Sequence, residues 1–323
     1  MIRSDRQNEM PKGVDFLKWF AILTILIISS ISLLGLSVTF EKSWGSQGNK
    51  DGQFSDPQGL ASDGKDFIYV ADTLNHRIQV FDSTGKHQMS FGRFGSERGE
   101  FLFPHDVVVD SKGSIYVADS QNGRVQKFDN ENKFVKSWGS KGAEPGQFDG
   151  PMYIAIDGAD TIYVGDAFNQ RVQVFDGEGT LLLTVGAKVD MFEAMNPGNL
   201  ASISGLSVDS NGNIYVSDDI MRRIQKFDSQ GNYISNWAST YEGNWGQPGE
   251  SVVDRFGNLF FINKMTSMIL VLDPDGNFLF EWGGVGTTSG LFTKPFNICV
   301  DGKDNVFVLE QLGNRIQRFK INY

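Results

Sequence analysis

Short runs of alternating apolar and polar residues, separated by turn residues, follow one another along most of the chain. The clearest example lies in residues 101–147, where Ser-Lys-Gly and Asp-Asn-Glu-Asn turns separate the runs. Alternation with a period of two between such turn signals is typical of β-strands. The strands predicted in this stretch are 106–110, 114–118, 124–128 and 133–138. The stretch therefore predicts one four-stranded antiparallel sheet.

Near-copies of this unit recur through the sequence. One aromatic position marks six copies, at Tyr69, Tyr116, Tyr163, Tyr215, Phe260 and Phe307. Their spacings are 47, 47, 52, 45 and 47 residues. A period of about 40 to 50 residues with several short strands per unit is typical of propellers. The pattern predicts an all-β fold, a six-bladed β-propeller of four-stranded antiparallel blades.

The two ends of the repeat region complement each other. The sixth copy ends after its third strand, at 316–319, whereas residues 39–46 match 133–140, which hold the fourth strand of the second copy, almost residue for residue. We expect residues 39–46 to complete the last blade, so that the ring has no free edge. The propeller is therefore predicted to span residues 39–323.

The unit resembles the NHL repeat. The resemblance rests on Asn75-His-Arg-Ile78 and its counterparts at 122–125, 169–172 and 314–316, and it covers residues 39–323. It implies a six-bladed propeller but no single activity, because unrelated functions use this scaffold. Some NHL propellers bind RNA through a basic face, and animal ubiquitin ligases carry the repeat behind a zinc-binding RING.

Charge and cysteine content argue against both of those functions here. The formal net charge is −10, and the first 18 residues hold four basic against three acidic side chains. An acidic propeller without a basic cluster argues against binding of nucleic acid. Cys299 is the single cysteine, so a cysteine-rich RING is excluded, and we expect it to be a small core residue.

The N-terminal segment has the composition of a membrane anchor. Residues 19–40 carry no charge and as a helix would reach about 33 Å, enough for a bilayer core of about 30 Å. We predict a cytoplasmic segment at 1–18, a transmembrane signal anchor at 19–38 and an extracytoplasmic propeller. The alternative is secretion after signal-peptide cleavage, although the apolar run is long for a signal peptide and lacks an Ala-x-Ala site.

The most regular charged feature is an acid at the end of each second strand with an arginine five residues later. The pairs are Asp72 and Arg77, Asp119 and Arg124, Asp166 and Arg171, Asp218 and Arg223, and Glu310 and Arg315. In the fifth copy the two positions are Asn263 and Met268. Five repetitions favour a structural role, in which each pair holds its loop by a charge-assisted hydrogen bond.

A second set of polar residues occurs where the first strands begin, and differs between copies. Its candidate binding residues are His105, Asp106, Tyr153, Glu250 and Asn297. In a propeller these positions lie around the axis at one mouth of the central channel. Asp106, Glu250 and Asn297 form an oxygen-rich group suited to calcium or another divalent cation. The alternative is a solvated rim of unrelated polar residues, and no cofactor is otherwise predicted.

One insertion interrupts the period, at residues 188–198, and bears Met191, Phe192 and Met195. It is either a contact surface, which Tyr241 and Trp245 would extend, or it packs on its own blade. No Ser-His-Asp order, P-loop or His-Glu-x-x-His motif occurs. We therefore expect a membrane-anchored scaffold that binds a protein, peptide or small ligand at the channel mouth. The alternative is a metal-dependent lyase or lactonase at the axis.

Overall fold

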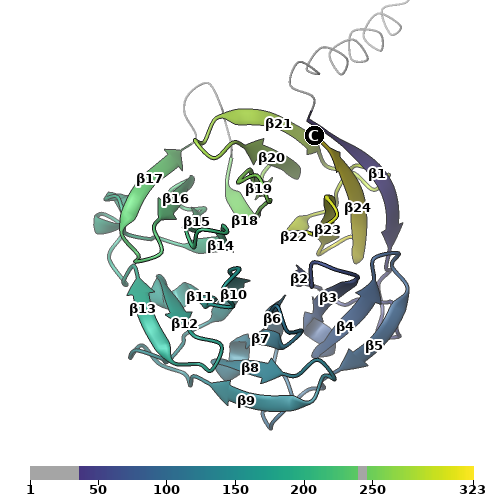
Figure 1. Ribbon diagram of the computed structural model, residues 1–323, viewed down its shortest axis with the longest axis horizontal. Helices are drawn as coiled ribbons and strands as arrows, with labels where there is room; N and C mark the ends of the chain where they lie inside the picture. Colours follow the sequence, from purple (N-terminus) through teal and green to yellow (C-terminus); the bar gives the residue numbers. More distant parts are fainter. Residues whose placement is uncertain (1–35, 239–245) are drawn as a thin grey trace, which may run out of the picture.

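Each repeat unit folds as one four-stranded antiparallel sheet in the computed structural model, which describes residues 36–238 and 246–323. The six sheets surround a common axis as the blades of a propeller (Figure 1). Blade one holds β2–β5, and blades two to five follow in chain order. Blade six has the strand order β1-β24-β23-β22. The predicted six-bladed all-β architecture is therefore confirmed.

The strands follow the predicted alternation within each blade. The innermost strands are β2 (Gly59–Ser62), β6 (Pro104–Val109), β10 (Pro151–Ile156), β14 (Ile203–Val208), β18 (Pro248–Val253) and β22 (Pro295–Val300). The second strands are β3 (Phe67–Asp72), β7 (Ile115–Asp119), β11 (Ile162–Asp166), β15 (Ile214–Asp218), β19 (Leu259–Asn263) and β23 (Asn305–Glu310). The third strands are β4 (Arg77–Asp82), β8 (Arg124–Phe128), β12 (Arg171–Phe175), β16 (Arg223–Phe227), β20 (Met268–Leu272) and β24 (Arg315–Asn322). The outermost strands are β5 (His87–Phe91), β9 (Phe134–Trp138), β13 (Leu181–Val185), β17 (Tyr233–Ala238), β21 (Phe278–Gly283) and β1 (Ser37–Trp44).

Four short 3-10 helices interrupt the loops of the described residues. Three of them follow second strands, namely η2 (Thr73–Asn75), η3 (Ser120–Asn122) and η4 (Ala167–Asn169). Each ends at a residue with positive φ, which is glycine only at Gly123. The fourth, η5 (Glu193–Met195), lies in the insertion between blades three and four.

The first strand closes the ring on the last. β1 pairs antiparallel with β24, with Trp44 opposite Ile316 and Ser37 opposite Asn322. The register shifts by one residue between Phe40 and Lys42. The strand begins at Ser37 rather than at the expected residue 39, so Ser37 and Val38 belong to the propeller and not to the segment 19–38. One row of backbone hydrogen bonds thus joins the two ends of the ring.

The predicted cytoplasmic segment 1–18, and residues 19–35 of the predicted transmembrane segment 19–38, lie outside the described residues. Among residues 36–238 and 246–323, no helix is long and apolar enough to cross a membrane.

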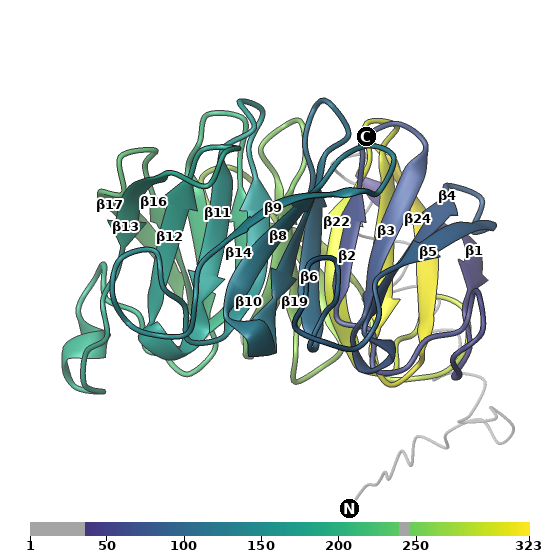
Figure 2. The same ribbon diagram turned by 90° about the horizontal axis from the view of Figure 1, so that it is seen from below.

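The antiparallel register assigns every loop to one of two faces. Innermost strands begin beside the ends of second strands, as Pro104 opposite Asp119 shows, and outermost strands end beside the starts of third strands. We call this side, which also carries the connections between blades, the mouth face. Ser37 and Asn322 lie at the opposite side, the far face. Figure 1 shows β1 beginning beside the C-terminus, and Figure 2 shows the C-terminus at one edge of the ring.

The core lies between adjacent blades. One cluster joins Tyr69 and Val80 of blade one to Val117 and Phe128 of blade two, and equivalent clusters follow around the ring. Tryptophans of outermost strands cover turns of the next blade. At Gly85, where φ is +81°, a Cβ atom would lie 2.5 Å from the Trp44 ring. Contact of this kind requires glycine at the turn and fixes neighbouring blades against each other.

Candidate functional site

The repeated acid and arginine pairs fasten loops to the connections between blades. Asp119 Oδ2 accepts hydrogen bonds from Asn122, Arg124 and Gln126, and its Oδ1 accepts one from the backbone of Leu102. Arg124 also donates to the carbonyl groups of the connection from blade one to blade two. Burial raises the pKa of Asp119 above its ordinary value, although these hydrogen bonds act to lower it. The Asp119 side chain is therefore held at its position by four neighbours rather than exposed to a ligand.

The structure brings all five predicted pairs together. The Nε to Oδ2 distance is 2.8 Å for Arg77 and Asp72, 2.7 Å for Arg124 and Asp119, and 2.8 Å for Arg171 and Asp166. Arg223 and Asp218 are 3.5 Å apart, and Arg315 and Glu310 are 2.5 Å apart. In blade five Asn263 instead accepts hydrogen bonds from the backbone of Met265 and Thr266. The fifth loop is thus fastened without an ion pair.

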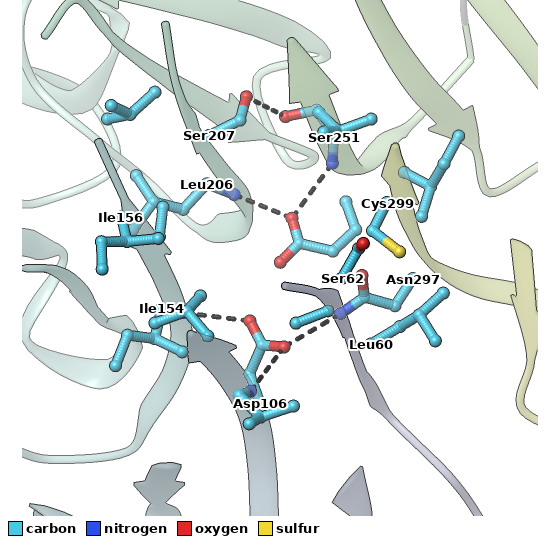
Figure 3. Close-up of a pocket in the computed structure, with 18 of the residues that line it drawn as sticks. Leu60, Ser62, Asp106, Ile154, Ile156, Leu206, Ser207, Ser251, Asn297 and Cys299 are labelled. Carbon is cyan, nitrogen blue, oxygen red and sulfur yellow. Dashed lines mark hydrogen bonds between the residues drawn. The ribbon is translucent and has the colours of Figure 1, made fainter. Parts of the chain in front are cut away.

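Three of the candidate polar residues are buried at the axis, and Figure 3 labels two of them, Asp106 and Asn297. Asp106, Glu250 and Asn297 are 3, 4 and 5% exposed. Asp106 Oδ2 accepts a hydrogen bond from the backbone of Ile154 in the next blade, 3.0 Å away. Glu250 Oε2 accepts one from the backbone of Leu206 in the preceding blade, 2.9 Å away. Both carboxyl groups therefore tie neighbouring inner strands together.

Two glycines make room for these acids. The position that holds Asp106 in blade two and Glu250 in blade five is Gly59 in blade one and Gly205 in blade four. A Cβ at Gly59 would lie 2.5 Å from Asp106 Cα, and one at Gly205 would lie 2.7 Å from Glu250 Cα. The inner strands approach too closely for any side chain there. A glycine followed by an acid in the next blade thus occurs twice, on opposite sides of the ring.

The acids adjoin an axial cavity of about 160 Å³, whose lining includes Cys299. Burial raises the pKa of Asp106 to about 7. Burial and the charge of Asp106 hold the pKa of Glu250 well above its ordinary value. The hydrogen bonds from backbone N–H groups lower both pKa values, but by less than removal of the carboxyl groups from water raises them. A buried pair of this kind favours at most one negative charge at neutral pH.

The donor chemistry of the axis was compared with that of a calcium site, which uses six to eight oxygen ligands. Both Asp106 oxygens already accept hydrogen bonds, and Asn297 directs its amide N–H groups to Asp106 Oδ1 and to the carbonyl of Gln58. Within the described part of the chain, no group of three or more His, Cys, Asp or Glu residues is arranged to hold a metal ion. A cation at Asp106, Glu250 and Asn297 therefore stays a hypothesis.

His105 and Tyr153, the other two predicted site residues, lie nearer the mouth. The rings of Tyr153 and Phe296 flank His105 at centroid distances of 5.5 and 5.7 Å. Burial lowers the pKa of His105 to about 4, although the ring keeps some access to solvent, so the imidazole is neutral at pH 7. The channel entrance is therefore aromatic and uncharged.

Beside this entrance the mouth face is hollowed by two adjoining pockets of about 310 and 350 Å³, which we call the mouth groove. Tyr153, Ser204 and Lys264 line both pockets. The inner pocket reaches Glu250 and Phe296, and the outer one reaches Phe168 and Ile220. The groove thus runs from the axis across blades three to six.

Two lysines line the inner pocket. Lys264 Nζ lies 2.6 Å from Asp219 Oδ2. Lys294 is exposed, and among residues 36–238 and 246–323 no carboxylate lies within 4.0 Å of its ammonium group. The groove thus has a positive side in a protein whose net charge is −10.

The mouth face also carries a repeated apolar position, the second residue after each second strand. Five of the six blades place a large apolar side chain there that is between 48 and 63% exposed. We call these residues the apolar crown: Leu74, Phe168, Ile220, Met265 and Leu312. Gln121 occupies the position in blade two. The same position of five blades thus exposes an apolar side chain on one face of the ring.

The insertion at 188–198 adds to this surface. Met191, Phe192 and Met195 are exposed, Phe192 by 80%, whereas Ala194 is buried. Arg223 Nη2 donates to the carbonyl of Ala194, which fixes the insertion to blade four. Its large apolar side chains thus face solvent rather than their own blade. Tyr241 and Trp245, expected to extend the patch, lie outside the described residues.

Sequence reasoning missed the apolar crown. The signal was present in the six aligned copies, because the acid that ends each second strand precedes the position by two residues. The sequence did not indicate that Lys264 and Lys294 line one pocket, because their proximity depends on the curvature of the ring.

The fold and its repeat define the class of protein: a six-bladed propeller that contains NHL repeats. The NHL repeat family matches residues 54–81 and 101–128. The chain is similar over 43 residues to the B-box type zinc finger protein ncl-1 of Caenorhabditis elegans, with 54% identity, and to Protein brain tumor of Drosophila melanogaster, with 49%. These matches span 13% of this chain and only 5% and 4% of those relatives.

Solved structures share the fold at low sequence identity. A protein from Bacteroides thetaiotaomicron has a TM-score of 0.67 at 17% identity, covering 89% of this chain and 76% of that one. A gluconolactonase from Xanthomonas campestris has 0.61 at 14%, covering 84% and 88%. A streptogramin B lyase has 0.59 at 12%, covering 91% and 100%. These likenesses show the propeller fold alone.

Proposed function

We propose that this protein is a membrane-anchored binding scaffold that holds a partner polypeptide or a small ligand on its mouth face. The observation that carries the proposal is the apolar crown, in which five blades expose a large apolar side chain at one repeated position. Exposed apolar patches rimmed by polar groups are typical of interaction sites. The adjoining mouth groove supplies concave surface with a few polar groups, as ligand sites commonly do.

The anchor rests on the sequence of residues 19–38. If it spans the membrane, the chain enters the propeller at the far face, because β1 starts there. Eight strand residues rise about 26 Å, so the mouth face is turned away from the bilayer. This orientation leaves the crown accessible to an extracytoplasmic partner. Retention of the full chain in carbonate-washed membranes, and its release only by detergent, tests the anchor.

Photo-crosslinking tests the binding face. A benzophenone amino acid is placed at Phe168 or Ile220 on the crown and, as matched controls, at Val135 or Leu182 on outermost strands, which are similarly exposed. We expect adducts of discrete mass from the two crown positions and none from the controls. Equal crosslinking from both sets, or adducts from the outer strands alone, would refute a role for the mouth face.

A second candidate function is a metal-dependent lyase or lactonase that works at the axis. The observation that favours it is the placement of Asp106 and Glu250 against an axial cavity, with Asn297 and His105 nearby. Metal content of the purified protein, together with thermal stability before and after chelation, separates the two functions. If the purified protein holds no metal and a chelator does not change its stability, the metal-dependent enzyme is refuted.

A further inference from the structure

The mouth groove has two halves of different chemistry. The outer pocket is lined by apolar side chains, which include Met152, Phe168 and Ile220, and by polar ones, which include Gln170 and Asp219. The ammonium group of Lys264 lines both pockets, and the inner pocket adds that of Lys294 beside the ring of Phe296. Because both halves are lined by Tyr153, Ser204 and Lys264, they adjoin each other.

The inner half is suited to an anion. Lys294 has no carboxylate within 4.0 Å in the described part of the chain, and Lys264 is paired with Asp219 at 2.6 Å and also attracts the carboxyl group of Glu250. The acid at the floor is Glu250, and burial together with Asp106 disfavours its charged form. The groove thus holds more positive than negative charge, although the whole chain is acidic. Charge complementarity therefore favours an acidic ligand group here.

We propose that the mouth groove binds an extended, acidic peptide segment, with a carboxylate side chain between Lys264 and Lys294 and a large apolar side chain against Phe168 and Ile220. In an extended chain, residues i and i+2 point to the same side and lie about 6.6 Å apart. Two such side chains of one segment enter the two pockets, which share Tyr153, Ser204 and Lys264. The inference rests on the function proposed above and names the chemistry of its ligand.

The path of the chain favours a peptide over a lipid surface as the occupant. Leu36 precedes β1, which begins at the far face, and 35 further residues come before it. A bilayer that holds those residues would meet the far face. The mouth groove, about 26 Å away along β1, would remain free for a soluble segment.

The test uses the full chain in detergent micelles and a library of randomised heptapeptides, acetylated and amidated so that their termini carry no charge. We expect selected peptides to hold Asp or Glu two positions from Phe, Leu, Ile or Met. For one selected peptide, Lys294→Glu is expected to weaken binding at least tenfold. Lys141→Glu, the same charge change at an exposed mouth-face residue outside the groove, is expected to weaken it less than twofold. A library selected on the Lys294→Glu protein should prefer Lys or Arg at the acidic position.

Other results separate this inference from the function on which it rests. Peptides without an acidic preference, or equal losses in Lys294→Glu and Lys141→Glu, would overturn the acidic ligand while crosslinking from Phe168 still supports a binding face. Flotation of the protein with phosphatidylserine vesicles, abolished by Phe168→Ser, would overturn the peptide in favour of a lipid surface. Binding unaffected by Phe168→Ser and Lys294→Glu, with no crosslinks from the crown, would overturn both proposals.

Discussion

Asn297 Nδ2 lies 3.1 Å from Asp106 Oδ1, and this hydrogen bond joins blade six to blade two past the inner strand of blade one. Gly59 of blade one stands beside the bond, and a Cβ there would lie 2.8 Å from the carbonyl oxygen of His105. The inner ring is thus a connected network in which a small residue in one blade permits a polar contact between its neighbours. Its stability should respond to both the size and the charge of its members.

Gly205→Ala tests the role of size. The added Cβ would lie 2.3 Å from the carbonyl oxygen of Gly249, a backbone atom that cannot move aside easily. We expect a loss of about 1–3 kcal/mol in the free energy of unfolding. Gly158→Ala is the matched control, because no heavy atom lies within 4 Å of its added Cβ. Denaturant titrations of the two variants should differ, and equal midpoints would show that the inner strands can separate.

Glu250→Gln tests the buried charge. A glutamine oxygen can still accept from Leu206 and Ser251, so the variant removes the ionisable proton but keeps these bonds. The folded-state pKa of Glu250 lies above its ordinary value, and that of Asp106 is about 7. The native state therefore binds more protons than the unfolded state above about pH 4, and stability falls as pH rises toward 7.

At pH 8 we therefore expect Glu250→Gln to be more stable than the wild type by on the order of 2 kcal/mol, and its stability to depend less on pH. Thermal denaturation between pH 4.5 and 8 measures both effects, with the exposed Glu144→Gln as control. If a cation were bound between the two acids, Glu250→Gln would instead be less stable than the wild type. Loss of stability in Glu250→Gln, together with sensitivity of the wild type to a chelator, would establish such an ion.

The sequence predicted the fold more fully than the site. Turn chemistry and alternation repeat in every unit, so strands, blade count and ring closure follow from comparison of copies. The burial of Asp106 and Glu250 does not, because it depends on how closely the inner strands approach at Gly59 and Gly205. The glycine in the copy before each acid reports that closeness only when the blades are already placed around an axis.

Blade five has Asn263 and Met268 at the two positions that form an ion pair in the other blades. Arg124→Met would leave the buried Asp119 without its cation, and we expect a loss of about 3 kcal/mol. Adding Asp119→Asn should restore part of that loss, because the amide removes the buried charge and recreates the arrangement of blade five. A double-mutant cycle by denaturant unfolding measures the coupling, which we expect to be about 1–3 kcal/mol. Strictly additive losses would show that the pair does not act as a unit.

Ring closure by β1 is the last relationship open to a direct test. A chain that begins at residue 45 lacks the strand that pairs with β24 and exposes both its backbone edge and the ring of Phe319, which Phe40 contacts at a centroid distance of 5.8 Å. We expect a lower melting temperature than for a chain that begins at residue 36, and association through the free edge. Differential scanning calorimetry with light scattering measures both. A synthetic peptide of residues 36–46 should restore the monomer, since it supplies the missing strand. Equal melting temperatures of the two chains would show that the propeller does not depend on its first strand.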